Sequence, residues 1–374
     1  MQKYRKNDII YLPGLNGLRA IAAIAVVISH ITLGLGEFGL NDKIFGTNID
    51  GNAKGSNLAG FGVTIFFTLS GFLITFLLLK EKAIAPFKIK EFYIRRILRI
   101  WPLYYLYFLI CIITILIYGF ELNKTSAAFY IFLSANIPFI LGNTLPFLAH
   151  YWSLGVEEQF YLIFPQLGKF SNKKLLKIST ILIMALLLIK FIFWILYKKY
   201  NITMPYLAIT VTRFHTMFIG VVGAIFFYYK HRVFFKICTN HFVQILSWSI
   251  IVLISINRFH IASILDGEIV SIITLFLIIG QITKKNKFID LDKPFWNFIG
   301  KISFGIYVIH PLLIFFCSKV LGKFRSPALI NYIFLYALIS SATIVLAYLS
   351  YTYFEKPFLK LKSKYSVVNT TNTK

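Results

Sequence analysis

The sequence predicts an all-α integral membrane protein that crosses the bilayer about ten times and keeps both termini in the cytoplasm. Three observations lead to this fold class. Hydrophobic residues make up 58% of the 374 residues and charged residues only 14%, which is unlike a soluble domain. Long apolar runs recur along the whole chain. Short clusters of Lys and Arg separate these runs, as in a polytopic membrane protein.

Ten segments are apolar and long enough to be membrane-spanning helices, which need roughly 20 residues. They cover approximately residues 15–36, 60–79, 100–119, 151–168, 178–197, 205–229, 242–258, 267–283, 301–319 and 328–353. The apolar segment 126–141 is treated differently, because an eleventh crossing would invert every later helix and spoil the charge asymmetry of the loops. We expect this segment to be interfacial or re-entrant on the outer side.

The distribution of Lys and Arg residues sets the orientation of these helices. With the N-terminus in the cytoplasm, 27 of the 39 Lys and Arg residues lie on the cytoplasmic side and nine on the outer side. The remaining three lie inside predicted spans and are Arg19, Lys190 and Arg213. An excess of basic residues marks cytoplasmic loops, so it accounts for the net charge of +25 without nucleic-acid binding. We expect residues 1–358 to form one membrane domain and residues 359–374 a basic, polar cytoplasmic tail.

The first predicted span carries two ionisable side chains, Arg19 and His30, in the stretch "LNGLRAIAAIAVVISHITLG". Their spacing of eleven residues is three helical turns plus about 20°, so both point to one face about 16 Å apart along the axis. Intramembrane ionisable residues usually line a site or a path. The structural alternative is that Arg19 reaches the lipid headgroups and His30 bonds a carbonyl of a neighbouring helix.

Three arginines, Arg95, Arg96 and Arg99, lie just before the third span in "EFYIRRILRIWPLYY". Arg95 and Arg99 stand at positions i and i+4 and share a helix face, which suits the binding of phosphates. A basic cluster in this position also anchors a helix against anionic lipid. We therefore expect an anion site at the cytoplasmic boundary of the membrane, with a topological anchor as the alternative.

The fourth span opens with the polar stretch "HYWSLGVEEQFYLIFP", which the predicted topology places at the outer membrane boundary. Ser153 and Glu157 stand at i and i+4 on one helix face. Because Glu157 and Glu158 are too costly to face lipid together, at least one of them points into the protein. That carboxylate either pairs with Arg213 of the sixth span or lines a polar substrate cavity together with Trp152.

Two further polar positions interrupt apolar spans. Ser70 and Gly71 lie in the middle of the second span, where small residues permit close helix approach. His310 precedes Pro311 in the ninth span, and a kinked, polar helix middle is more often a cavity wall than a packed interface. At the cytoplasmic end of the last span, Glu355 is expected to pair with the arginine cluster.

Seven stretches of the sequence together resemble acyltransferase family 3, the membrane-bound acyltransferases that include bacterial O-antigen acetylases and nodulation-factor acyltransferases. They are, in the family's order, "GLRAIAAIAVVISH", "FFTLSGFL", "RRILRIWPLYY", "WSLGVEEQFYL", "TRFHTMFIG", "SFGIYVIHPLL" and "YFEKPF", within residues 11–358. The resemblance implies ten spans, an acyl-CoA donor drawn from the cytoplasm, and an acceptor hydroxyl on an external sugar or a lipid-linked intermediate. It also implies that Arg19 and His30 are essential. We expect no fused extracytoplasmic hydrolase-like domain of the kind some relatives carry, so a second transfer step would need a separate partner.

The donor end of this reaction suits the basic residues. Arg95, Arg96 and Arg99 are expected to bind the phosphates of acyl-CoA, with Arg19 deeper on the path of the thioester. His30 then stands where the acyl group meets the acceptor. It serves either as the general base for the acceptor hydroxyl or as a relay that carries the acyl group itself.

The remaining polar residues are expected to act around His30. Glu157 orients His30 or binds sugar hydroxyls, and Ser70 or Arg213 stabilises the oxyanion. The expected catalytic residues are thus His30, Arg19, Glu157 and Ser70. The expected substrate-binding residues are Trp152, Ser153, Glu157, Arg213 and His310.

The sequence thus predicts an O-acyltransferase of the bacterial cytoplasmic membrane that moves an acyl group, acetyl by default, from acyl-CoA to a cell-envelope polysaccharide or lipid-linked sugar. Membrane lipid and the glycan are the expected partners, and no metal ion or nucleic acid is expected. The main alternative is a multi-pass transporter or flippase of a lipid-linked saccharide, since buried Arg, His and Glu residues also form proton relays. The arginine cluster and the lack of an inverted repeat argue against it.

Overall fold

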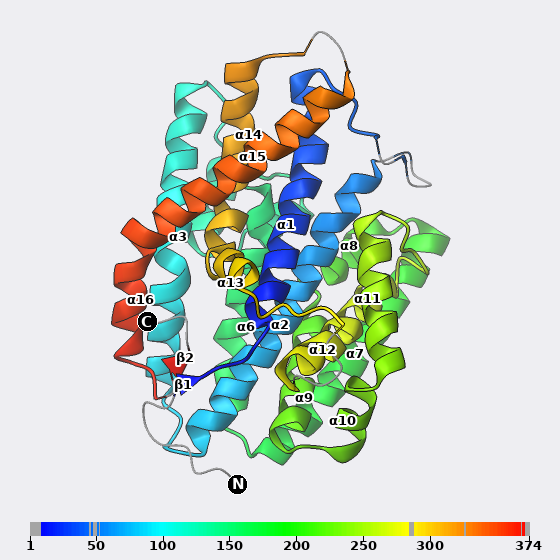
Figure 1. The fold of residues 1–374 in the computed structure, drawn as a ribbon, viewed down its shortest axis with the longest axis vertical. Helices are drawn as coiled ribbons and strands as arrows, with labels where there is room; N and C mark the ends of the chain where they lie inside the picture. The colour runs from blue at the N-terminus through cyan, green and yellow to red at the C-terminus, as the bar shows by residue number, and fades with distance from the viewer. Residues whose placement is uncertain are drawn as a thin grey trace.

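The computed structural model confirms a helical, polytopic membrane protein (Figure 1). The structure describes residues 9–44, 46–47, 51, 53–283, 288–324, 327–367 and 369–370. Within these ranges, eight helices are long and apolar enough to cross a membrane. A ninth span forms if α10 (Arg232–Cys238) and α11 (His241–Ser255), which meet at a bend of 53°, count as one.

The candidate spans follow the predicted segments in order. They are α1 (Leu15–Gly34), α2 (Asn57–Lys82), α3 (Ile89–Ile117), α7 (Asn172–Tyr200), α8 (Thr203–Thr212) with α9 (Phe214–Tyr228), α12 (Asp266–Thr283), α14 (Ser303–Leu321), and α15 (Leu329–Leu349) continued by the π-helix Ser350–Glu355 and α16 (Lys356–Ser363). The predicted fourth span is α6 (Trp152–Gly168), a helix of 17 residues. A total of ten crossings stays a prediction. Short helix α13 (Pro294–Lys301) leads into α14.

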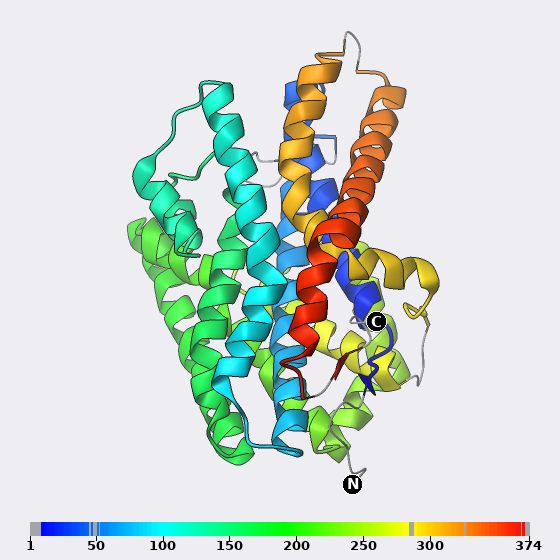
Figure 2. The same ribbon diagram turned by 90° about the vertical axis from the view of Figure 1, so that its left-hand side faces the viewer.

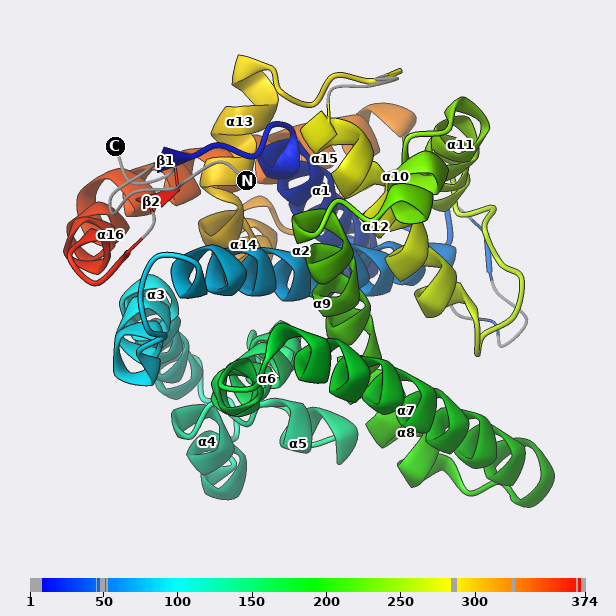
Figure 3. The same ribbon diagram turned by 90° about the horizontal axis from the view of Figure 1, so that it is seen from below.

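Helix α2 lies in the middle of the bundle, between α1 and α9 (Figure 3). Inside the most apolar part of α2, 78% of the residues are buried by the protein, against 11% in α7. Lipid therefore covers most of α7, whereas α2 is a core helix whose polar residues must find partners within the protein.

Glycines permit a close crossing of α2 and α9. A Cβ atom at Gly71 would lie 2.0 Å from the carbonyl oxygen of Met217, and one at Gly220 would lie 2.3 Å from that of Thr68. Close approach through small residues is a usual way for membrane helices to gain packing energy. The structure thus gives the predicted role in helix approach to Gly71 and leaves the neighbouring hydroxyl of Ser70 free for other contacts.

Substitution Gly71→Ala is expected to lower the free energy of unfolding by about 1–3 kcal/mol, because the new methyl group forces the two helix backbones apart. Thermal unfolding of the detergent-solubilised protein measures the effect. The matched control is Gly60→Ala in the same helix, where a Cβ atom would meet nothing within 4 Å. Equal unfolding temperatures for the two variants would contradict the close crossing.

The segment 126–141 does not form a spanning helix, as predicted. It overlaps α4 (Lys124–Ile131) and contains α5 (Asn136–Ile140), which packs against α6 and α8 (Figure 3). The hydroxyl groups of Tyr104 and Tyr105 donate hydrogen bonds of 2.8 Å to the carbonyl groups of Tyr130 and Ile131. These tyrosines lie about 20 Å before the end of α3, so the segment turns back toward the middle of the bundle. We call it the re-entrant segment for this path, and its place in the membrane or at the interface stays a prediction.

The two ends of the described chain meet at one end of the bundle. Strand β1 (Ile9–Ile10) pairs in parallel with β2 (Asn369–Thr370), near the lower end in Figures 1 and 2. The ends of α2 and α3 that carry Glu81 and Arg95 lie at this same end, which we call the terminal side. The two ends of the described chain thus lie on one side, and the location of both termini in the cytoplasm stays a prediction.

Cysteine labelling tests this orientation. Helix α7 has 29 residues and carries exposed lysines near both of its ends, Lys173 and Lys199. In intact cells, Lys173→Cys is expected to resist a membrane-impermeant thiol reagent until the membrane is opened, whereas Lys199→Cys reacts at once. Both are placed in a Cys317→Ser background, because Cys317 is half-buried while Cys111 and Cys238 are buried. The opposite pattern would invert the topology.

Candidate active site

A cavity of about 170 Å³ lies among α1, α2, α3, α6, α14 and α16. On the terminal side its lining includes Tyr11 beside β1 and Lys362 of α16. Along α2 the lining extends from Glu81 to Val63, which corresponds to about 27 Å of helix. The cavity therefore begins at the terminal side and reaches the middle of the helices.

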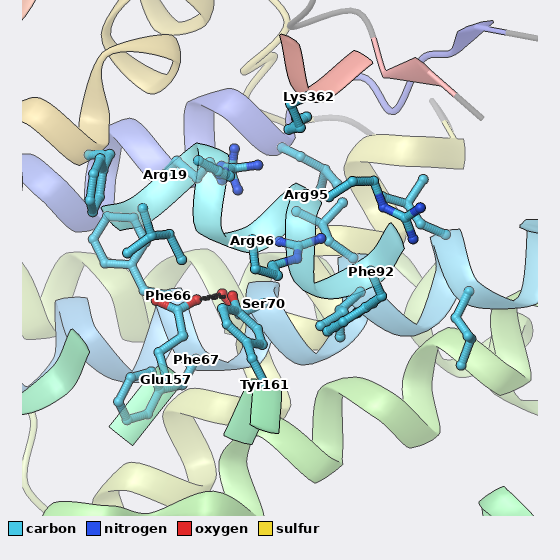
Figure 4. Close-up of a pocket in the computed structure, with 18 of the residues that line it drawn as sticks. Arg19, Phe66, Phe67, Ser70, Phe92, Arg95, Arg96, Glu157, Tyr161 and Lys362 are labelled. Carbon is cyan, nitrogen blue, oxygen red and sulfur yellow. Dashed lines mark hydrogen bonds between the residues drawn. The ribbon is translucent and has the colours of Figure 1, made fainter. Parts of the chain in front are cut away.

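Basic side chains line the terminal half of this cavity (Figure 4). They come from three elements that are far apart in the sequence and are Arg19 of α1, Arg95, Arg96 and Arg99 of α3, and Lys362 of α16. The structure thus brings the intramembrane Arg19 together with the predicted arginine cluster. Lys362 was not singled out, because in the sequence it is one of several lysines of the predicted polar tail.

The three arginines of α3 differ in their partners. Arg95 is 2.8 Å from the carboxylate of Glu81 and donates a second hydrogen bond of 2.8 Å to the carbonyl of Tyr365. Arg96 stacks its guanidinium over the rings of Phe92 and Tyr161, at 5.6 and 5.1 Å, and its buried Nε has no hydrogen-bond partner. Arg95 is therefore engaged in an ion pair with Glu81, and joint binding of phosphate by Arg95 and Arg99 stays a prediction.

Among the described residues, the ion pairs include none for Arg19, Arg96 or Arg99. Glu355, which was expected to pair with this cluster, instead accepts a hydrogen bond of 3.2 Å from Ser350. Arg19, Arg96 and Arg99 thus line one cavity, and among the described residues none of them forms an ion pair with a carboxylate. Such an arrangement suits a ligand that carries several negative charges.

Glu157 lines the same cavity and accepts hydrogen bonds from the hydroxyl groups of Ser70 and Tyr161 (Figure 4). The sequence placed Glu157 at the outer membrane boundary, and this placement is wrong. The re-entrant segment carries the start of α6 deep into the bundle, so Glu157 lies on the wall shared with the arginines. Its hydrogen bonds hold Ser70, and no contact joins it to His30.

Arg213 lies away from this cavity. It donates hydrogen bonds to Thr64 Oγ1 at 3.0 Å and to the carbonyl groups of Gly60 and Thr210 at 3.2 and 2.8 Å, and it stacks over Trp152 at 5.4 Å. The alternative pairing of Arg213 with the acids of α6 is not observed. Neither Arg213 nor Trp152 belongs to the cavity lining, so neither supports a shared site with Glu157.

The predicted pairing partner Glu158 has a different contact, accepting a hydrogen bond of 3.0 Å from the indole of Trp101. The third intramembrane basic residue, Lys190, forms a buried ion pair of 2.6 Å with Glu268. His215 also contacts Glu268, at 2.9 Å. These contacts join Lys190, His215 and Glu268 in one buried cluster, in which His215 Nδ1 and Glu268 Oε2 have no hydrogen-bond partner.

Three histidines gather beyond the inner end of the cavity. His30 Nδ1 lies 2.6 Å from His310 Nε2, and the two ring planes are 20° from parallel with their centroids 4.9 Å apart. The ring of His150 lies 6.4 Å from that of His30 and 5.5 Å from that of His310. His150 belongs to the 3₁₀ turn Ala149–Tyr151, which the re-entrant segment brings inward. The sequence marked His30 and His310 as polar positions but gave no sign that they pair.

A layer formed by Phe66 and Tyr307 separates the histidines from the basic cavity. Both residues line the cavity, and their rings meet edge to face at 6.1 Å. The Tyr307 hydroxyl donates a hydrogen bond of 2.7 Å to the carbonyl of His150 and lies 2.5 Å from the hydroxyl of Ser153. His30 and His310 are not among the cavity residues. Ser153, which was expected to bind substrate, therefore lies between the basic cavity and the three histidines.

Comparison with known proteins agrees with this arrangement. The model of acyltransferase family 3, described as an acyltransferase domain, matches residues 12–352. A predicted O-acetyltransferase of Staphylococcus aureus strain COL, SACOL0978, is 30% identical over 96% of this chain and 58% of its own length. The O-acetyltransferase OatA of Staphylococcus aureus strain NCTC 8325 is 28% identical over 94% of this chain and 57% of its own length.

This chain therefore spans less than two thirds of the length of these relatives. No solved structure matches the chain. The family match nonetheless extends from just before α1 into the π-helix of the last candidate span. It includes Arg19, the arginines of α3 and the three clustered histidines, whereas Tyr11 and Lys362 of the cavity lie outside it. On this match, the chain belongs to acyltransferase family 3, a family of membrane acyltransferases.

Proposed function

We propose that this protein is a membrane-bound O-acyltransferase. It takes an acyl group, acetyl by default, from acyl-CoA on the terminal side, which is the cytoplasm in this proposal. The acceptor is a hydroxyl group of a cell-envelope polysaccharide or a lipid-linked sugar. The observation that carries the proposal is the basic cavity, in which Arg19, Arg96 and Arg99 have no carboxylate partner among the ion pairs of the described residues, and which approaches the His30–His310 pair.

The positive charge of the cavity supports acyl-CoA as the donor. Coenzyme A carries several phosphate groups, and Arg19, Arg96, Arg99 and Lys362 offer positive charges from three different elements around one cavity. Arginine binds phosphate through two parallel hydrogen bonds, which a flexible lysine does not provide. The pantetheine arm is long and uncharged, so it extends from this basic region along the cavity wall toward Tyr307.

The position of the histidines supports a site of acyl transfer at the inner end of the cavity. With phosphates held near Arg19, the thioester passes Phe66 and Tyr307 to reach His30, which lies beyond these two rings. His30 then removes the proton of the acceptor hydroxyl as general base. The Ser153 hydroxyl, which lies 2.5 Å from that of Tyr307, donates to the carbonyl oxygen of the thioester once it rotates away from Tyr307 and the His150 carbonyl.

The cellular setting in this proposal is the bacterial cytoplasmic membrane, with the acceptor on the outer side. The relatives named as O-acetyltransferases support an O-linked product. A separate extracytoplasmic transferase is a candidate partner for any later transfer step.

Transfer from radiolabelled acetyl-CoA tests the proposal. Purified protein in liposomes is incubated with the donor and with cell-envelope glycans or lipid-linked saccharides, and label is expected in the saccharide fraction. Acetyl-pantetheine, which lacks the nucleotide and its phosphates, is the matched donor and is expected to be used poorly. Label held on the protein would favour the acyl-histidine relay, and no label from any acyl-CoA would favour a transporter or flippase.

A further inference from the structure

We infer that His310 is a positioning residue that fixes the tautomer of His30 and leaves the lone pair on His30 Nε2 available for the reaction. This role rests on the proposed function of His30 as general base. It replaces the expectation, drawn from the sequence, that His310 binds substrate.

The hydrogen-bond partners of His310 determine where its proton lies. His310 Nδ1 is 3.0 Å from the carbonyl oxygen of Ile306, and a carbonyl oxygen only accepts hydrogen bonds. Nδ1 of His310 therefore carries the proton. In a neutral imidazole the other nitrogen then has a lone pair, so Nε2 of His310 is an acceptor.

The same reasoning extends to His30. Its Nδ1 lies 2.6 Å from the acceptor Nε2 of His310, and this contact is a hydrogen bond only if His30 Nδ1 is the donor. The proton of neutral His30 is thus on Nδ1, and Nε2 keeps its lone pair. A chain from the Ile306 carbonyl through His310 sets the tautomer of His30, as a third group orients the base in hydrolytic triads.

Packing holds His310 in this orientation. Its side chain is fully buried, with a relative exposure of 0%. Its ring plane is 20° from that of His30, with the centroids 4.9 Å apart, and it meets the ring of His150 edge to face at 5.5 Å. His150 is held in turn by a contact of 3.2 Å between its Nε2 and the carbonyl of Val308, on the same helix as His310. The ring of His310 is therefore held between the rings of His30 and His150.

The role of His310 in the reaction follows from this geometry. His30 Nε2 takes the proton of the acceptor hydroxyl while the hydroxyl oxygen attacks the thioester carbonyl. The carbon–sulfur bond breaks, and the departing thiolate takes the proton from His30 Nε2, which gives the ester and free coenzyme A. Between these steps His30 is an imidazolium, and its Nδ1–H remains bonded to His310 Nε2. His310 thereby stabilises the cation without contacting substrate.

The tautomer of His30 is measured directly by nitrogen NMR of protein labelled with ¹⁵N-histidine. The His30 signals are identified by their loss in His30→Gln. In the wild-type protein, Nδ1 is expected to give a protonated-type signal and Nε2 an unprotonated-type signal. In His310→Ala, the His30 signals are expected to show a mixture of the two tautomers. In His310→Gln, whose side-chain amide oxygen replaces the acceptor, the wild-type pattern is expected to return.

Kinetics give the second readout. His310→Ala is expected to lower kcat by about 10²- to 10⁴-fold, the range for a base that is present but wrongly set, with donor affinity unchanged. His310→Gln is expected to recover part of this loss. A proton on Nε2 of wild-type His30, or a His310→Ala protein with wild-type kcat, would overturn the inference. Since the wild-type NMR pattern needs no turnover, absence of any acyl transfer would overturn the proposed function alone.

Discussion

Replacement of His30 with alanine is expected to abolish acyl transfer while acyl-CoA still binds. In the proposed function the imidazole is the base for the acceptor hydroxyl, and loss of a general base costs about 10²- to 10⁴-fold in kcat. The proposed phosphate site around Arg19 and the α3 arginines is about 16 Å along α1 from His30. Transfer from radiolabelled acetyl-CoA measures kcat, and equilibrium binding of the labelled donor measures its Kd.

The matched control for His30→Ala is His241→Ala, which removes an exposed histidine at the start of α11. This variant is expected to transfer acyl groups at the wild-type rate. If His30→Ala kept substantial transfer, the histidine would be a packing group, and a proton path in a transporter would become the simplest account of the buried pair with His310.

Replacing Arg96 and Arg99 together with glutamine is expected to weaken acyl-CoA binding by about 100-fold or more. Each arginine loses a charge-assisted interaction with phosphate worth about 1.5–3 kcal/mol, and 1.4 kcal/mol corresponds to tenfold in affinity. Isothermal titration of coenzyme A into the detergent-solubilised protein gives the Kd. Wild-type retention on gel filtration shows that the variant is folded.

Two further variants separate ligand binding from charge and from stability. Lys198→Gln with Lys199→Gln removes the same number of charges at exposed positions at the far end of α7 and is expected to leave the Kd unchanged. Arg95→Gln is expected to lower the unfolding temperature more than the affinity, because it leaves the buried carboxylate of Glu81 without its partner. Unchanged CoA affinity in the Arg96 and Arg99 variant, with poor membrane insertion, would make the cluster a topological anchor.

Much of the architecture is visible in the sequence because the bilayer imposes it. A helix must be long enough to cross the hydrocarbon core, and its loops carry the charge asymmetry that sets orientation. The spans therefore appear as apolar runs at nearly the positions of the helices. The segment 126–141 is recognised in the same way, since an extra crossing would break the alternation of basic loops. Its depth among the helices comes only from contacts such as that between Tyr104 and Tyr130.

The candidate site is visible in part for the same reason. A charged or polar side chain in an apolar helix is expensive, so Arg19, His30, Glu157 and His310 stand out individually. The sequence also grouped Arg95, Arg96 and Arg99 by their spacing. The sequence did not show that Arg95 differs from Arg96 and Arg99. Arg95 forms an ion pair with Glu81, which lies at the end of another helix.

The sequence by itself determined which residues of this protein are costly in a membrane and therefore need a partner or a ligand. Only the tertiary structure decided which partner each one has. His30 contacts His310, which is 280 residues away in the sequence. Glu157 was expected at the outer membrane boundary, but it lines the basic cavity because the re-entrant segment places the start of α6 inside the bundle. The physical reason is that the hydrophobic effect is non-directional. An apolar sequence therefore indicates that a helix is buried, but it does not indicate which helix packs beside it. Hydrogen bonds and ion pairs are directional and short, and they form only after packing has placed the helices.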